Sequence, residues 1–190
     1  MPFSPRSQAT RDAILAAARA QFSARGYDAT TIRSVAAEAG IDPSMVMRYY
    51  SNKDGLFDAA IDVDLALPDL AAVPARQRGA VLARHLVDRW EGSQADGALV
   101  LLLRSVATKP AAAERVRAVF AGQVLQMVRR VVADPAEAPV RAAMVSSQVL
   151  GVALCRHVVG IPPLAGLDGE SLVAVLAPVL QHHLTGRYPL

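Results

Sequence analysis

The stretch Gly40–Phe57, GIDPSMVMRYYSNKDGLF, limits the fold of this 190-residue chain more than any other. Gly40 closes one helical pattern, and Asp42-Pro43 supplies an N-cap followed by a proline at the first helical position. The helix that starts there can last only about two turns, because Ser51 to Asp54 already carries the signals of another helix start. Two helices joined by a tight turn, the second of them short, are typical of a helix-turn-helix.

Apolar residues at helical spacing predict three further helices around this stretch. The patterns favour a first helix over about 10–25, a second over about 30–39 and a fourth over about 53–67. Thr30 is predicted to cap the second helix and Ser51 the fourth. Within the short third helix, Val46 and Tyr50 fall on the side that should face the others.

The rest of the chain reads as helices separated by proline and glycine. The segment LPDLAAVPARQ, residues 67–77, holds two prolines and marks the boundary between a small head and a larger body. Helical patterns follow near 75–91, 94–107, 110–133, 136–160 and 168–185, and no segment alternates long enough to be a strand. We therefore predict an all-α fold of about nine helices. It should comprise a three-helix helix-turn-helix domain over 1–54, a connecting helix over about 53–67, and a larger helical bundle over 68–190.

Composition excludes several classes of protein. Apolar residues make up 53% and charged ones 19%, so the chain has a large core and is not disordered. The single Cys155 cannot form an internal disulfide, and no Cys/His cluster has the spacing of metal ligands. The first residues lack the apolar run of a signal peptide, and the uncharged stretches Ala142–Cys155 and Ser171–Gly186, 14 and 16 residues, are shorter than the ~20 that cross a bilayer. We expect a cytoplasmic protein with no membrane partner, metal or cofactor.

The net charge of +3 is unevenly placed. Residues 1–53 hold seven Arg or Lys against four acids, which is the entire excess, whereas residues 54–190 hold 13 of each sign. A basic N-terminal part is typical of a protein that meets a polyanion, although a solvated basic face has the same signature.

The outer side of the short helix is predicted to bind DNA. Ser44, Met45, Met47 and Arg48 are free to enter a major groove, which admits one helix. Arg48 suits a guanine edge or a phosphate, and the methionines suit thymine methyl groups. Phosphate contacts are predicted at both ends of the motif, by Thr30, Thr31, Arg33, Tyr49 and Lys53.

The segment Ile14–Phe57, ILAAARAQFSARGYDATTIRSVAAEAGIDPSMVMRYYSNKDGLF, resembles the N-terminal domain of TetR-family transcriptional regulators. The shared pattern is Phe-x-x-x-Gly-Tyr, then Thr-Thr-Ile-x-x-Val-Ala-x-x-Ala-Gly, the short helix, and x-x-Lys-x-x-Leu-Phe. Members of the family often carry an aromatic residue where Met47 stands and a histidine where Tyr49 stands. The resemblance implies a dimeric, all-helical repressor with a variable ligand-binding body, which binds a palindromic operator and is released by an effector.

In that family two protomers pair through their last two long helices. The corresponding apolar stripes here give the predicted dimer interface: Val145, Val149, Val152, Leu176, Val179 and Leu180. The same residues also suit an intramolecular core. The effector is expected to be a small, mostly apolar molecule, with the connecting helix over 53–67 as the lever between head and body. Candidate pocket residues are Trp90, Arg104, Phe120, Gln123, Met127, Gln148, Cys155 and His157.

Two other readings stay open. An architectural DNA-binding protein without an effector would share the head but enclose no cavity in the body. A helical enzyme would have to use Cys155 and the four histidines, His85, His157, His182 and His183, none of which belongs to a catalytic motif. We predict that the chain is not an enzyme.

Overall fold

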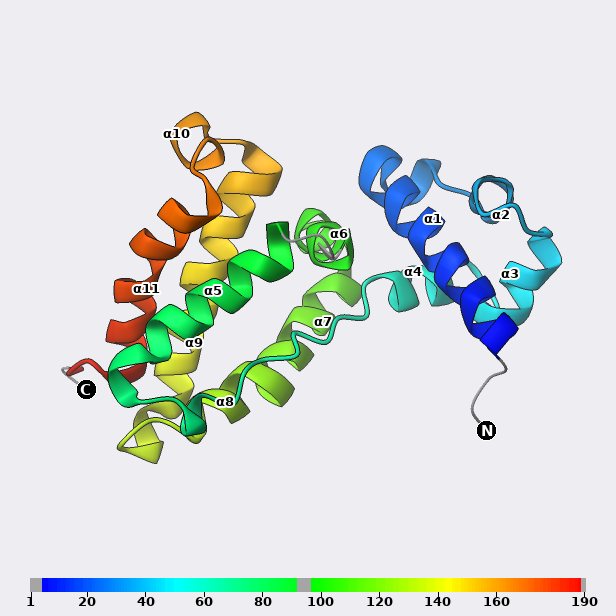
Figure 1. Cartoon of the computed structure of the whole chain (residues 1–190). Helices are drawn as coiled ribbons and strands as arrows, with labels where there is room; N and C mark the ends of the chain where they lie inside the picture. Colours follow the sequence, from blue (N-terminus) through cyan, green and yellow to red (C-terminus); the bar gives the residue numbers. More distant parts are fainter. Residues whose placement is uncertain (1–4, 92–96, 189–190) are drawn as a thin grey trace. The chain divides into compact units, whose positions relative to one another are not determined.

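The computed structural model describes residues 5–91 and 97–188, which form helices and no strand (Figure 1). The prediction of an all-α fold is confirmed. The chain divides into two compact units. The N-terminal unit holds residues 5–63 together with 97–113, and the C-terminal unit holds residues 64–91 and 114–188. The chain thus passes from one unit to the other three times.

The N-terminal unit is built on α1 (Pro5–Ala29), which packs against α2 (Ile32–Glu38), α4 (Lys53–Ala60) and α6 (Gly97–Ser105). The short α3 (Pro43–Tyr50) packs against α2 and α4. The core consists of Ile14, Ala18, Phe22, Val35, Val46 and Phe57 with Leu101 and Leu102 of α6. Inclusion of α6 was not predicted, because its uniformly apolar sequence does not reveal which unit it will pack against.

Polar caps fix where the short helices begin, and two of them differ from the prediction. Thr31, not Thr30, caps α2: its hydroxyl accepts the Ser34 amide at 3.0 Å, while the Ser34 hydroxyl accepts the Thr31 amide at 3.1 Å. Asn52, not Ser51, caps α4 by accepting the amide of Gly55 at 2.8 Å. Both shifts have one cause, since the residue with an extended backbone is the one whose side chain can reach the third amide along the helix.

The first helix begins earlier than predicted, at Pro5, and keeps its predicted break near residue 25. Gly26 is non-helical with φ of 77°, a backbone that side chains other than glycine rarely adopt. Residues 27–29 therefore turn away from α1 and lead to the cap of α2.

The predicted connecting helix over 53–67 is wrong beyond residue 60. α4 ends at Ala60, and the chain continues without helix to the 3₁₀ turns Leu70–Ala72 and Ala75–Gln77. Two hydrogen bonds hold this path: the Leu65 amide donates to Gln123 Oε1 at 2.7 Å, and the Ala66 amide to the Asp64 carboxylate at 2.9 Å. A side-chain acceptor thus replaces the helical carbonyl, as Asp favours in turns.

The C-terminal unit is a helical bundle around an aliphatic core. Its helices are α5 (Arg78–Glu91), the end of α7 (Pro110–Val119), α8 (Leu125–Arg129), α9 (Ala138–Ala153), α10 (Pro162–Ala165) and α11 (Gly169–Thr185). Wider π-helical turns, Phe120–Val124 and Leu154–Val159, follow α7 and α9, and a 3₁₀ turn, Pro135–Glu137, precedes α9. α5 lies along α11, and Gly79 permits this approach because a Cβ there would clash with the Ala177 carbonyl oxygen.

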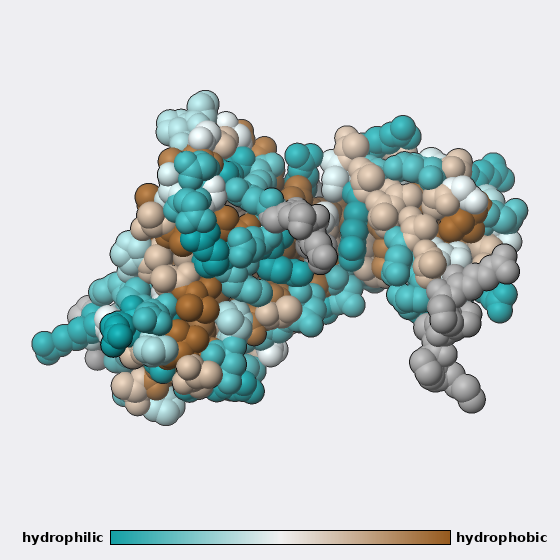
Figure 2. Space-filling view, viewed as in Figure 1, coloured by the Kyte–Doolittle hydropathy of each residue, from teal (hydrophilic) through white to brown (hydrophobic). Residues whose placement is uncertain are grey.

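One continuous helical stretch, Pro135–Val159, is by length and composition able to cross a membrane, yet only 17% of its most apolar window is buried. The sequence estimate of 14 uncharged residues counted only the part between Arg141 and Arg156. Figure 2 shows that hydrophobic residues (brown) also reach the surface of the C-terminal unit, among hydrophilic ones.

Candidate nucleic-acid interface

The short α3 has one buried side and one exposed side. Val46 is fully buried and Tyr50 is 6% exposed, as predicted. Ser44, Met47 and Arg48 are exposed on the opposite side, and Met45 is half-buried. Met47 leaves 45% of its surface to solvent, which is unusual for a large apolar side chain. The helix therefore presents a compact apolar and basic surface outward while two residues anchor it.

Two contacts anchor Tyr50 on α1. Its hydroxyl donates to the Arg11 carbonyl at 3.4 Å, and the Arg11 guanidinium lies 5.9 Å from the ring centre. Burial raises the pKa of Tyr50, so it stays neutral around pH 7. The adjacent Tyr49 is half-buried, and its hydroxyl lies 3.0 Å from the Ser7 hydroxyl. A phosphate contact by Tyr49 would have to share or replace that bond.

At the start of α2 the two neighbouring threonines have different surroundings. Thr31 and Arg33 are exposed, next to the N-terminus of the helix. Thr30 is 1% exposed, and its hydroxyl donates to the Gly26 carbonyl at 2.8 Å. The predicted phosphate contact by Thr30 is therefore withdrawn, because its hydroxyl is used inside the protein.

Lys53 lies against Tyr27, at the end of α1. Its ammonium donates to the Asp28 carbonyl at 3.2 Å and is 4.3 Å from the Tyr27 ring centre. Lys109, just before α7, places its ammonium 3.3 Å from the same ring centre. Two cations on one aromatic ring favour a nearby anion. Lys109 stands 82 residues from Tyr27 in sequence, so no local pattern could have predicted this contact.

The Tyr27 ring is held by two phenylalanines and a carboxylate. It stacks on Phe22 at 5.8 Å and meets Phe57 edge-on at 5.4 Å between ring centres. Its hydroxyl donates to Asp54, and this bond is the main reason why the pKa of Tyr27 rises to about 12. The cluster ties the end of α1 to the start of α4, the two elements that flank the turn-helix pair.

Two family models match the chain. The model of bacterial regulatory proteins of the tetR family matches residues 14–60, and the tetracyclin repressor-like C-terminal domain matches residues 77–184. The chain belongs to the TetR family. It is therefore a ligand-responsive, DNA-binding transcriptional regulator.

Solved structures agree on the fold. A TetR-family regulator from Streptomyces coelicolor is 28% identical, with a TM-score of 0.58, over 97% of this chain and 99% of that one. NalD, the secondary repressor of the MexAB-OprM multidrug efflux pump in Pseudomonas aeruginosa, is 18% identical with a TM-score of 0.71, over 96% and 100%. A transcriptional regulator from a Rhodococcus species is 21% identical with a TM-score of 0.70, over 94% and 99%. No curated protein matches significantly.

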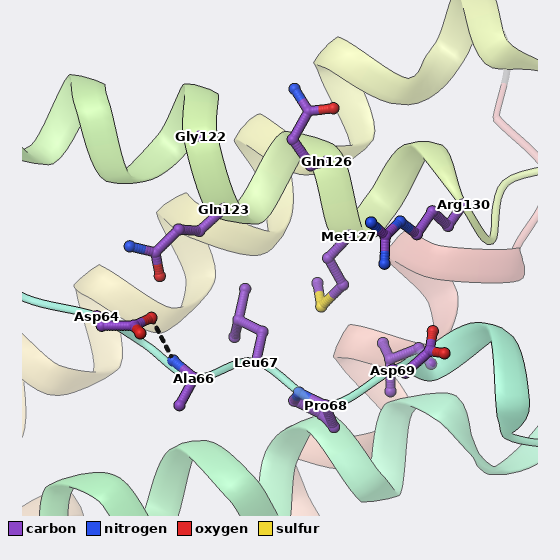
Figure 3. A pocket seen from close by; sticks show the side chains of 11 residues that line it. Asp64, Ala66, Leu67, Pro68, Asp69, Gly122, Gln123, Gln126, Met127 and Arg130 are labelled. Carbon is purple, nitrogen blue, oxygen red and sulfur yellow. Dashed lines mark hydrogen bonds between the residues drawn. The ribbon is translucent and has the colours of Figure 1, made fainter.

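In the body of this TetR-family regulator, the predicted pocket residues do not converge on one site. Gln123 and Met127 line a cavity of about 320 Å³, together with the segment 64–70 (Figure 3). Trp90 and His157 stack at 5.4 Å between ring centres beside a much smaller gap of about 20 Å³. Arg104 belongs to the N-terminal unit, where it donates to the Ser23 carbonyl at 3.0 Å. Phe120 packs against the aliphatic core, whereas Gln148 and Cys155 are half-buried farther along the chain.

Half of the six predicted dimer residues lie inside the protomer. Val145, Leu176 and Leu180 are 3%, 4% and 0% exposed and belong to the core, and Val149, Val152 and Val179 are half-buried. Helical spacing identified the apolar stripes but not which of two apolar faces turns inward. The exposed large apolar residues of the same two helices and the turn after α9 are Val140, Met144, Leu154, Val159 and Val175.

Proposed function

We propose that this TetR-family regulator is a homodimeric repressor that inserts α3 of each protomer into the major groove of a near-palindromic operator. The observation that carries the proposal is the two-sided α3, whose exposed side combines Ser44, Met47 and Arg48. The basic excess of the chain falls entirely within residues 1–53, the segment that contains this helix.

The exposed groups divide by chemistry into base readers and phosphate binders. Arg48 suits the two acceptors of a guanine edge, and Met47 offers an apolar contact to a thymine methyl group. Arg33 and Thr31, at the start of α2, suit a phosphate because helix N-termini favour anions. Lys53 and Lys109 supply positive charge beside Tyr27, where they add attraction without base preference.

Support for a dimer comes from an exposed stripe on α9 and the turn after it. Its members are spaced four and three residues apart and carry no charge: Val140, Met144, Ser147, Gly151 and Leu154. On α11 the same spacing gives Ser171, Val175, Pro178 and His182, of which Ser171 is half-buried and the others are exposed. Exposed apolar residues such as Met144 and Val175 at this spacing are typical of helix–helix pairing. A second copy of the chain would cover both faces across a two-fold axis.

Control by an effector requires the C-terminal unit to influence the N-terminal one. The three passages of the chain between the units provide the route, in place of the single continuous helix predicted from the sequence. A small molecule that binds the C-terminal unit in one arrangement more tightly than in another would shift the operator affinity by a typical ~1–3 kcal/mol.

We also propose that the chain catalyses no reaction and acts in the cytoplasm, where its DNA target lies. All four of its histidines have structural partners, and the ring centre of His182 lies 5.8 Å from that of Tyr188. His85 Nε2 lies 2.9 Å from the Leu65 carbonyl oxygen, His157 stacks on Trp90, and His183 Nδ1 lies 2.6 Å from the Tyr188 hydroxyl.

Selection from random duplexes, combined with light scattering, tests the proposal. We expect a near-palindromic site with half-sites about one helical turn apart, roughly 34 Å, and a dimer at micromolar concentration. An asymmetric selected site, or a monomer that binds tightly, would overturn the dimeric arrangement. Met144→Glu should give a folded monomer with weakened operator binding, whereas Ala133→Glu, an exposed change between α8 and α9, should leave the dimer intact.

A further inference from the structure

The cavity of about 320 Å³ in the C-terminal unit has Asp64 at one end, Arg130 together with Asp69 at the other, and an apolar middle. One wall is the segment 64–70, which leads away from α4, and the other is formed by Gly122, Gln123, Gln126, Met127 and Arg130. Figure 3 shows Asp64 and Arg130 at opposite ends, with Leu67, Pro68 and Met127 between them. The volume lies near the lower limit for ligand pockets, ~300 Å³, so a small metabolite is the suitable size.

Arg130 and Asp64 each have atoms left to pair with a ligand. Within the described part of the chain, the Arg130 guanidinium has no hydrogen-bonded or ion-paired partner. One Asp64 oxygen accepts the Ala66 amide at 2.9 Å, which leaves the other oxygen for a cation. Gln126 does not contribute, because its amide turns away from the segment 64–70 and donates to the Ala121 carbonyl at 3.1 Å.

We propose that this cavity binds a small zwitterion with its two charges at the ends of a short aliphatic chain, as in an ω-amino acid. Its carboxylate pairs with Arg130, in the two-pronged geometry that guanidinium favours, and its ammonium pairs with Asp64. Its methylene groups pack on Leu67, Pro68 and Met127. This inference deepens the proposed function by naming the effector class, and it replaces the mostly apolar effector expected from the sequence.

A ligand in this cavity would contact the start of one of the three passages that connect the units. The Leu65 amide is held by Gln123 Oε1 at 2.7 Å, and Ala66 adopts φ of 47°, in the left-handed region that alanine avoids. The segment that carries these features begins one residue after the N-terminal unit ends at Val63. A ligand that bridges Asp64 and Arg130 therefore fixes the first residues of one of the three passages.

Calorimetric titration of the full chain with three matched probes tests the charge requirement. ε-Aminocaproate has both charges, caproate only the negative one and hexylamine only the positive one. We expect ε-aminocaproate to bind about threefold to tenfold more tightly than either single-charge probe. The factor is modest because both protein charges are exposed. Equal binding of all three probes, binding of hexylamine alone, or no binding overturns the proposal.

Four substitutions locate the site. Arg130→Gln and Asp64→Asn should each remove the advantage of ε-aminocaproate, and the Asn variant keeps an oxygen to accept the Ala66 amide. Asp69→Asn should instead tighten binding, because Figure 3 places the Asp69 carboxylate at the same end as Arg130, where it competes with the ligand carboxylate. Arg129→Gln, at an exposed position that does not line the cavity, is the control and should change nothing.

Two further variants guard against misfolding and against a site elsewhere. A Cβ at Gly122 would meet no atom within 4 Å, so Gly122→Phe can fill the space and should abolish binding in a folded protein. Arg130→Glu should reverse the preference toward hexamethylenediamine. Retained ε-aminocaproate binding in Gly122→Phe would place the site elsewhere.

Gel shifts with the selected operator, with and without ε-aminocaproate, separate the two proposals. Specific DNA binding that no probe changes would refute this effector class and leave the DNA-binding function standing. Absence of a specific operator would refute the DNA-binding proposal while calorimetry still decides the cavity.

Discussion

The two units are specified by different kinds of information. In the N-terminal unit, caps at Thr31, Asp42 and Asn52 and the aromatic cluster of Phe22, Tyr27 and Phe57 set each short helix. In the C-terminal unit, an aliphatic core of Leu, Val and Ala packs the helices together. Polar caps and ring contacts tolerate few replacements, whereas aliphatic residues exchange readily at constant volume. A DNA-reading head can therefore stay recognisable while the body adapts to a new ligand.

The largest expected effect tests which face of α11 is inside. Leu180→Ala should cost about 2–5 kcal/mol of protomer stability, because Leu180 is fully buried, whereas Val175→Ala, at a residue 61% exposed, should cost less than about 0.5 kcal/mol in a monomer. Urea unfolding of each variant at two protein concentrations measures both. A Leu180→Ala loss that appears only in concentrated protein, where the wild type is a dimer, would return Leu180 to the dimer interface predicted from the sequence.

The next effect separates base reading from general attraction in the N-terminal unit. Arg48→Ala should cost about 1–3 kcal/mol on the selected operator and relax preference at a single base position. Lys53→Ala should weaken binding to all sequences and flatten the dependence of affinity on salt. Competition gel shifts over a salt series measure both changes. Arg129→Ala, on the surface of the C-terminal unit, is the matched control. A uniform loss for Arg48→Ala would assign Arg48 to a phosphate.

The extent to which the sequence predicts the structure also differs between the units, because polar caps and rings specify one and aliphatic packing the other. In the head, the sequence predicted the short α3 with its N-cap Asp42 and its buried Tyr50, because each of these roles needs a particular side chain at a particular spacing. The two cap errors, Thr30 and Ser51, each missed by one residue, since adjacent polar residues give the same signal. In the body, periodicity identified α9 and α11 but could not rank their two apolar faces.

Long-range contacts account for the remaining misses. α4 ends at Ala60, and the non-helical path that follows is held by the Leu65–Gln123 hydrogen bond, which joins residues 58 apart in sequence. The placement of Lys109 on Tyr27 and of Arg130 opposite Asp64 is likewise decided by packing. A single sequence carries no signal for such pairs, because neither partner alone shows which distant residue it will meet.

A smaller effect tests the two threonines that the prediction exchanged. Thr31→Ala removes the N-cap of α2 and should cost about 1 kcal/mol of stability. Thr30→Val removes the donor to the Gly26 carbonyl and should cost about 1–3 kcal/mol at most, because a buried acceptor is left without its partner. Only Thr31→Ala should also weaken DNA binding beyond its effect on stability, because only Thr31 is exposed. Thermal unfolding and gel shifts on both variants decide; a DNA-specific defect in Thr30→Val would contradict the assignment.

The smallest effect is a response to pH that only the C-terminal unit should show, because all four histidines lie in it. Burial lowers the pKa of His157 below its ordinary value of about 6.5, although Glu91, 3.7 Å away, acts in the opposite direction and Arg156 again lowers it. The unfolded chain therefore binds a proton more readily than the folded one. The contribution of His157 to stability is complete above about pH 6.5 and is lost as the pH falls through the lowered pKa.

Trp90 reports this titration directly, because it is the only tryptophan and its ring stacks on His157 at 5.4 Å with an angle of 10° between planes. A protonated imidazole quenches indole emission, so the fluorescence should fall on acidification with a midpoint below about pH 6.5. Glu91→Gln should move that midpoint lower still, since the carboxylate that favours the charged imidazole is gone, and His157→Gln should abolish it. A midpoint above about 6.5 would mean that Glu91 outweighs burial and would reverse the sign of the stability change. DNA binding by the N-terminal unit, which lacks histidine, should vary far less over the same pH range. If DNA binding and Trp90 fluorescence were equally sensitive to acid, the proposed difference between the units would be wrong.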